Sequence, residues 1–214
     1  YWLPFWLFVL LAIYFYFWPI FRAMRFLFPL LVLLVLVSPL LAEKSLSLAV
    51  VLGAAFFIFL GVKDLVLAER RLSYEIFILI LAFLGFFTFF AHFENWLGLG
   101  VVVSSLVLSL VLFFLSKNLI NYEDSILKEI DFSASTVTVA SGTIAFLVWQ
   151  AVWGFLFLPF SYLYQTLALL IFTFVLFELT LAYLSKNLTS KKVLTQFSIL
   201  FVFLVLALTS TPWG

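Results

Sequence analysis

The sequence predicts an all-α fold, a polytopic bundle of transmembrane helices within a single integral membrane domain over residues 1–214. Hydrophobic residues make up 67% of the chain and charged residues only 10%, whereas soluble domains carry about 25% charged residues. A soluble globule of this composition would lack the polar side chains needed to cover its surface. The apolar residues also form long runs without the alternation of a membrane β-strand, which favours helices over a barrel.

Each apolar run is long enough, or nearly long enough, to cross the membrane. A hydrocarbon core of about 30 Å needs about 20 helical residues at about 1.5 Å each. The pattern predicts about eight crossings, and seven to nine are compatible with it. The second run is the least well defined, because Pro29 and Pro39 lie near its two ends. The predicted crossings are 3–20, 26–42, 46–67, 74–91, 97–116, 136–158, 163–184 and 193–211.

The basic residues predict the orientation. Every Lys and Arg except Lys44 falls in one of four connections, at 21–25, 62–72, 117–135 and 185–192. Because Lys and Arg accumulate in cytoplasmic loops, these connections are predicted to face the cytoplasm, with both termini outside. The plasma membrane is the expected location. Tryptophans at or near the opposite surface agree, since an indole keeps its ring in lipid and its N–H in water. They are Trp2, Trp6, Trp96, Trp153 and Trp213.

The longest polar break, residues 117–135, predicts a separate amphipathic helix at the cytoplasmic interface. Leu119, Ile126 and Ile130 recur near helical spacing, and charged residues with a net acidic balance fill the opposite side: Glu123, Asp124, Lys128, Glu129 and Asp131. The acidic charge weakens attraction to anionic lipid, so the segment is expected to dock against the protein's own helices. Ser133 or Ser135 is expected to cap the next crossing.

The tetrapeptide Ser-Lys-Asn-Leu occurs at 116–119 and again at 185–188. Each copy is predicted to close a helix, with Lys at the negative helix end and Asn in the left-handed conformation. An internal duplication is the alternative. We favour convergence on a similar helix end, because the similarity does not extend into the flanking residues.

Glu178 is the clearest candidate for an intramembrane polar site. It lies about seven residues from the cytoplasmic end of its crossing, and therefore about 10 Å deep. A carboxyl at this depth is expected to be protonated, paired or in contact with a wet cavity. Lys63 is the predicted partner, because its long side chain can reach inward from the third crossing. A structural ion pair is favoured over a proton- or cation-coupling carboxylate.

Gln150 is the second candidate, close to the middle of the sixth crossing. It shares a four-residue stripe with Thr138, Gly142 and Gly154, and this stripe predicts close helix packing more strongly than substrate contact. The fifth crossing carries Ser105, Ser109 and Ser116 along one side, and the third carries Ala49, Gly53 and Gly61. These stripes are expected to face the interior of the bundle.

The residue types exclude most other chemistry. The chain has no cysteine, and His92 is its single histidine, so no thiolate metal site or multi-histidine zinc site is expected. No cofactor is predicted. The net charge of +1 provides no basic face for nucleic acid, so the expected partners are membrane lipids and other transmembrane surfaces, including a second copy of the chain.

Three functions are compatible with these features. A non-enzymatic structural or accessory subunit of a membrane assembly is favoured, because no acid, base and nucleophile converge at one depth. A small-solute or ion transporter or channel that uses Glu178 and Gln150 is the alternative. A lipid-modifying membrane enzyme is the third, and no catalytic residue is assigned.

Overall fold

The computed structural model describes residues 10, 28–29, 31–33, 70–93, 98–127, 133–158 and 161–210, and all regular structure among them is helical. The predicted all-α fold class is therefore confirmed for this part of the chain. The five long helices are α4 (Arg70–Phe93), α5 (Leu99–Leu127), α6 (Ala134–Leu156), α7 (Tyr162–Leu184) and α8 (Ser190–Ser210).

Four of these helices are long and apolar enough to cross a membrane, which indicates an integral membrane protein. Their candidate spans are Tyr74–His92, Leu99–Tyr122, Ala134–Leu156 and Tyr162–Leu184. Each span coincides with a predicted crossing, and α8 coincides with the last predicted run. Of the three predicted crossings before residue 70, only helical residues 10, 28–29 and 31–33 are described, so the total of eight remains a prediction.

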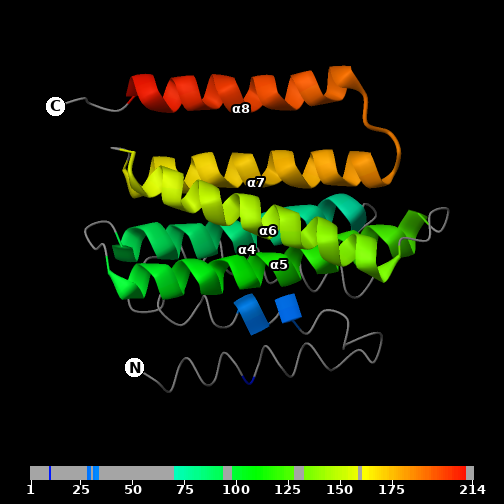
Figure 1. Ribbon diagram of the computed structural model, residues 1–214, viewed down its shortest axis with the longest axis horizontal. Coiled ribbons are helices and arrows are strands. Elements are labelled where there is room, and N and C mark those ends of the chain that lie inside the picture. Colours follow the sequence, from blue (N-terminus) through cyan, green and yellow to red (C-terminus); the bar gives the residue numbers. More distant parts are fainter. Residues whose placement is uncertain are drawn as a thin grey trace. The chain divides into compact units, whose positions relative to one another are not determined.

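The chain divides into two compact units, Tyr1–Leu81 and Ala82–Gly214. In the first unit, the side chains of Tyr74, Phe77 and Ile78 are buried. In the second unit, α5 packs on α6, α6 on α7 and α7 on α8 (Figure 1). Short connections and apolar faces explain this succession, because neighbouring helices in a bundle bury their faces most directly against the next helix in the chain.

The predicted separate helix at 117–135 is not observed as an element of its own. Residues 117–127 continue α5, and α6 begins at Ala134. The apolar positions of this segment instead extend the core: Ile120 is buried in a cluster with Val137 of α6 and with Leu181 and Leu184 of α7. This placement agrees with the expected docking of the segment on the protein's own helices. Residues 128–132 lie outside the described residues.

The start of α6 has the predicted cap. Ser133 is extended, with φ −61° and ψ 141°, and its Oγ accepts a hydrogen bond from the backbone N–H of Thr136 at 3.2 Å. An N-cap hydroxyl of this kind satisfies one of the backbone donors that the first helical turn leaves unpaired. Ser133 is therefore the capping residue of the two that the sequence offered.

The serine stripe of α5 faces α6, as predicted. The Oγ of Ser109 donates a hydrogen bond to the backbone carbonyl of Ala145 at 3.1 Å, and Trp149 Nε1 donates to Ser105 Oγ at 3.2 Å. Ser105 and Ser116 are both buried. Small hydroxyl side chains allow close helix approach and supply hydrogen bonds where water is absent.

The predicted stripe on α6 faces the interior of the bundle only at its first two residues. Gln150 and Gly154 are exposed, whereas Thr138 and Gly142 are half-buried, and a Cβ added to Gly142 would lie 4.0 Å from the ring of Phe113 on α5. The buried face of α6 consists of four branched apolar residues and two small ones: Val137, Ser141, Ile144, Ala145, Val148 and Val152. Burial of branched apolar side chains decided the helix rotation, rather than the spacing of small and polar residues.

Candidate functional site at the contact between α7 and α8

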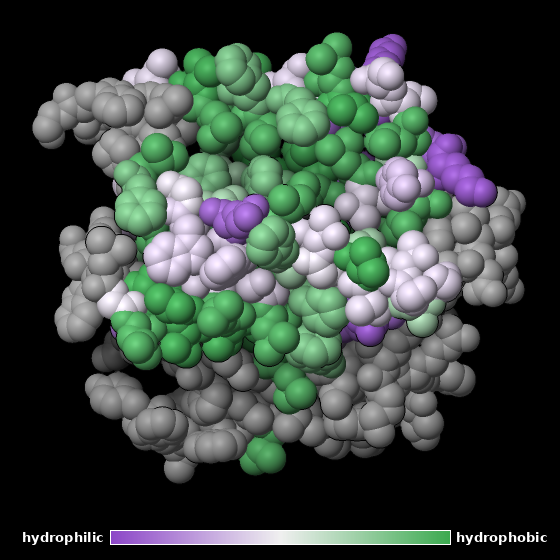
Figure 2. Space-filling model, in the orientation of Figure 1, coloured by the Kyte–Doolittle hydropathy of each residue, from purple (hydrophilic) through white to green (hydrophobic). Residues whose placement is uncertain are grey.

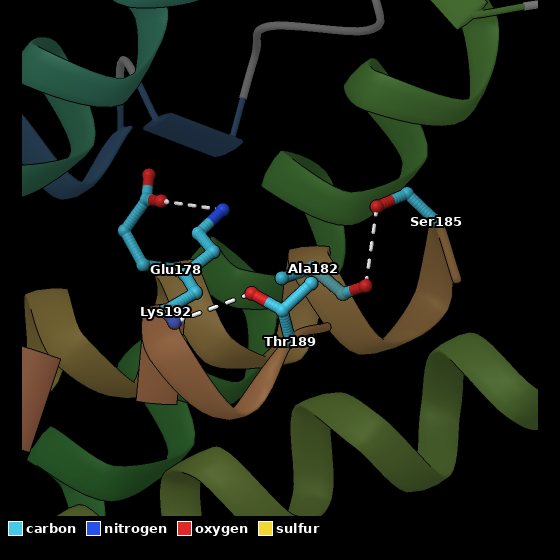
Figure 3. A network of polar contacts seen from close by, with 5 residues as sticks. All are labelled: Glu178, Ala182, Ser185, Thr189 and Lys192. Carbon is cyan, nitrogen blue, oxygen red and sulfur yellow. Dashed lines mark hydrogen bonds and ion pairs between the residues drawn. The ribbon is translucent and has the colours of Figure 1, made fainter. Parts of the chain in front are cut away.

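Glu178 lies on α7, and its carboxylate forms an ion pair with Lys192 of α8. The distance from Lys192 Nζ to Glu178 Oε2 is 3.4 Å (Figure 3). The side chain of Glu178 is 22% exposed and that of Lys192 is 39% exposed. Since α7 ends at Leu184, the carboxylate-bearing residue lies about 9 Å along the helix from its carboxyl end. The predicted paired carboxyl therefore has a partner in α8.

The end of α7 sets the chain direction that makes this pair possible. Lys186 has a positive φ of 56°, and its N–H bonds to the Tyr183 carbonyl at 3.1 Å. The N–H of Asn187 bonds to the Ala182 carbonyl at 2.9 Å. These two bonds form a Schellman motif, which terminates the helix and reverses the chain.

The start of α8 then places Lys192 opposite Glu178. The backbone N–H of Lys192 bonds to Thr189 Oγ1 at 3.3 Å, so Thr189 is the N-cap of α8 (Figure 3). Lys192 is the third residue of the helix. From this position its flexible four-carbon side chain can extend along α8 toward Glu178, keeping its stem against apolar surface.

These details correct the reading of the repeated Ser-Lys-Asn-Leu sequence. At 116–119 the tetrapeptide lies inside α5 and closes no helix. At 185–188 it does follow a helix end, but the left-handed residue is Lys186 rather than Asn187. The two copies thus have different conformations, and the surroundings decide between them: Ile120 is buried in the core cluster, so α5 continues beyond the first copy.

The three predicted site residues do not form one described site. Lys63 lies outside the described residues, so its pairing with Glu178 remains a prediction. Gln150 is exposed on α6, about 9 Å from the carboxyl end of that helix. The core cluster brings the start of α6 level with the end of α7, so Gln150 and Glu178 differ in depth by about 15 Å.

Two glutamines that were not among the predicted site residues have buried amide atoms. Gln165 of α7 donates from Nε2 to the carbonyls of Phe155 at 2.9 Å and Leu158 at 3.3 Å, which ties the start of α7 to the end of α6. Gln196 lies one turn beyond Lys192, and its buried Oε1 has no hydrogen-bond partner within the described part of the chain. In the sequence, the four-residue spacing between Lys192 and Gln196 indicates that the two side chains lie on the same side of a helix.

Trp153 departs from its predicted environment. Its indole Nε1 is buried and has no hydrogen-bond partner in the described ranges, whereas its place in the sequence predicts an N–H in contact with water. Trp2, Trp6, Trp96 and Trp213 lie outside the described residues. The position of Trp153 near the end of a predicted crossing therefore did not determine its environment. The rotation of α6 about its axis turns the indole nitrogen toward the interior.

Basic residues gather at one end of the second unit. Lys117 of α5, Lys186 and the adjacent Lys191 and Lys192 all lie near the Ile120 core cluster or the α7–α8 connection. No group of three or more His, Asp and Glu side chains that could hold a metal ion occurs among the described residues. Within the described residues, the site consists of the Glu178–Lys192 pair, the amide of Gln196 one turn beyond Lys192, and the basic connection between α7 and α8.

No known protein-family model matches the chain, and neither a curated protein nor a solved structure matches it.

Proposed function

We propose that the chain is a structural or accessory subunit of a plasma-membrane assembly and binds a partner chain through the outward face of α6. This proposal includes eight crossings, with the basic connections in the cytoplasm and both termini outside. The observation that carries it is the exposed amide of Gln150, within a helix long enough to cross the membrane.

The outward face of α6 differs from that of α5. Between Leu99 and Ser116 of α5 no exposed residue is polar, as lipid contact requires, and the large exposed residues there are Leu99, Val102, Val103, Leu106, Val107, Leu110 and Phe114. The exposed face of α6 instead combines Val139 and Phe146 with Thr143, Gln150 and Gly154. An amide without a hydrogen-bond partner in hydrocarbon costs about 2 kcal/mol or more, so contact with a polar group of another helix is favourable.

Gly154 adds room for close approach. A Cβ placed on Gly154 would meet no atom within 4 Å, so a partner helix could approach the backbone there. Small residues at helix interfaces serve this purpose in membranes, where burial of apolar surface gives no advantage over lipid. Together, Gln150 and Gly154 supply a hydrogen-bonding group and a close-contact position on one face.

Photocrosslinking in native membranes tests this proposal. A benzophenone amino acid at Phe146 is expected to give adducts with another membrane protein chain, and Gln150→Leu is expected to reduce them. The matched controls are the same crosslinker at Phe114 on the apolar face of α5 and at buried Val148. Adducts at Phe146 with lipid alone, or only with residues 1–69 of the same chain, would contradict the proposal.

Transport is the alternative, and the surroundings of Glu178 favour it over an enzyme. Lys192, which pairs with Glu178, lies one helical turn before Gln196, whose buried Oε1 is a second acceptor without a hydrogen-bond partner in the described part of the chain. A proton- or cation-coupled carrier would lose flux in proteoliposomes on Glu178→Gln while retaining its fold. Unchanged flux in that variant would exclude this use of Glu178.

A further inference from the structure

A groove of about 570 Å³ runs between α7 and one flank of α8 in the second unit. Ile171 lines it from α7, and Thr195, Ser198, Val202 and Leu206 are among the residues that line it from α8. Its polar side chains lie near the start of α8, and the residues farther along are apolar. The groove therefore changes from polar to apolar along the helix.

We propose that this groove binds an acyl chain of an anionic glycerophospholipid, whose phosphate lies at the ammonium group of Lys191. The proposal does not depend on the partner surface of α6. It rests on the dimensions of the groove, on the direction of its polarity and on the charge at its polar end.

The dimensions fit one lipid chain. From Leu194 to Leu206 the groove follows twelve residues of α8, or about 18 Å, close to the thickness of about 15 Å of one hydrocarbon leaflet. The groove is open along its outer side, so an acyl chain could enter it directly from the surrounding lipid.

The charge at the polar end favours an anionic headgroup. Lys191 is exposed and lies one turn before Thr195 on the same flank of α8. The connection 185–192 contains Lys186, Lys191 and Lys192 but no acidic residue, and only Lys192 has an ion pair within the described ranges. Basic pockets between transmembrane helices bind anionic lipid headgroups, because a Lys near the membrane surface attracts them.

The surface around the groove agrees with this placement. Leu194, Val202 and Leu206 are each more than half exposed, so α8 offers an apolar flank to lipid. Figure 2 shows mainly hydrophobic residues over α8, with hydrophilic residues gathered near the end where α7 connects to α8. The Oγ1 of Thr195 donates to the Lys191 carbonyl at 2.9 Å, which leaves the exposed Ser198 hydroxyl as the nearest further polar group for the glycerol region.

Native mass spectrometry of the full chain in detergent tests the proposal, with dioleoyl-phosphatidylglycerol as the anionic probe and dioleoyl-phosphatidylcholine as its zwitterionic counterpart. Phosphatidylglycerol is expected to bind more tightly. Lys191→Gln is expected to weaken phosphatidylglycerol binding about fivefold and to leave phosphatidylcholine unchanged. Val202→Trp, which fills the groove from an exposed position, is expected to reduce binding of both lipids.

The matched controls separate the groove from general effects. Lys117→Gln removes one positive charge at the same end of the unit but on α5, and Val205→Trp makes the same enlargement on α8 outside the groove lining. Neither is expected to change lipid binding. Circular dichroism and melting confirm that each variant is folded. Equal affinity for the two lipids, retention of phosphatidylglycerol by both Lys191→Gln and Val202→Trp, or a second protein chain displaced by Val202→Trp would overturn the proposal.

Discussion

The ion pair between Glu178 and Lys192 is expected to stabilise the α7–α8 hairpin by about 1 kcal/mol. At a separation of 3.4 Å the Coulomb attraction is about 1 kcal/mol in water and about 5 kcal/mol at an effective dielectric constant of about 20. Because 39% of the Lys192 side chain is exposed, solvent screening and side-chain ordering bring the net value toward the lower figure.

A double-mutant cycle measures this energy. Glu178→Gln, Lys192→Gln and the double variant are unfolded in mixed micelles of nonionic detergent and dodecyl sulfate, and the coupling is the departure from additivity. Each single variant leaves one charge without its partner. The double variant is therefore expected to lose less stability than the sum of the losses of the two single variants. A coupling within about 0.3 kcal/mol of zero, as for independent sites, would refute the stabilising role of the pair.

Three further predictions concern helix ends and α6. Lys186→Gly is expected to stabilise the chain by about 1 kcal/mol in the same unfolding assay, because glycine adopts the positive φ of 56° without Cβ strain, whereas Lys186→Ala should give no such gain. Ser133→Ala is expected to cost about 1 kcal/mol through loss of the α6 cap, and Ser133→Asp should retain most of that stability. Gly154→Ala is expected to raise the stability of the isolated chain by about 0.5 kcal/mol or more, since its added Cβ meets open space, while weakening the Phe146 crosslink to a partner. An unchanged crosslink would count against Gly154 as a close-contact position.

Hydropathy and helix-end chemistry were sufficient to predict much of the fold. The five predicted runs from residue 74 onward correspond to the described helices α4 to α8, because an apolar run that is not part of a closed barrel can satisfy its backbone in lipid only as helix. The cap at Ser133 was also predictable, since a hydroxyl before an apolar run is a local signal. The full length of α5 was not, because its continuation past Lys117 depends on the burial of Ile120 against residues distant in sequence.

The candidate site was harder to predict, because helix rotation and pairing are not local properties. Gln150 and Gly154 have the spacing of an interface, but the six buried residues of α6 turned them outward. Among the described residues, the partner of Glu178 is Lys192 of the next helix. The chain reverses between the two helices at Lys186, which has a positive φ. A carboxyl inside an apolar run thus predicted that a partner was needed without specifying which lysine would supply it.

Lys191 and Lys192 are adjacent in sequence, but their side chains lie on different sides of α8 and are expected to have different roles. In sequence they form one positive cluster, but consecutive residues on a helix point in directions about 100° apart. Lys192 faces α7 and pairs with Glu178, whereas Lys191 shares the groove flank with Thr195 and Ser198. The same Lys→Gln change should therefore lower folding stability at 192 and anionic lipid binding at 191. If both variants changed both properties equally, net charge alone would explain the effects, and the separate roles inferred from the helix geometry would be wrong.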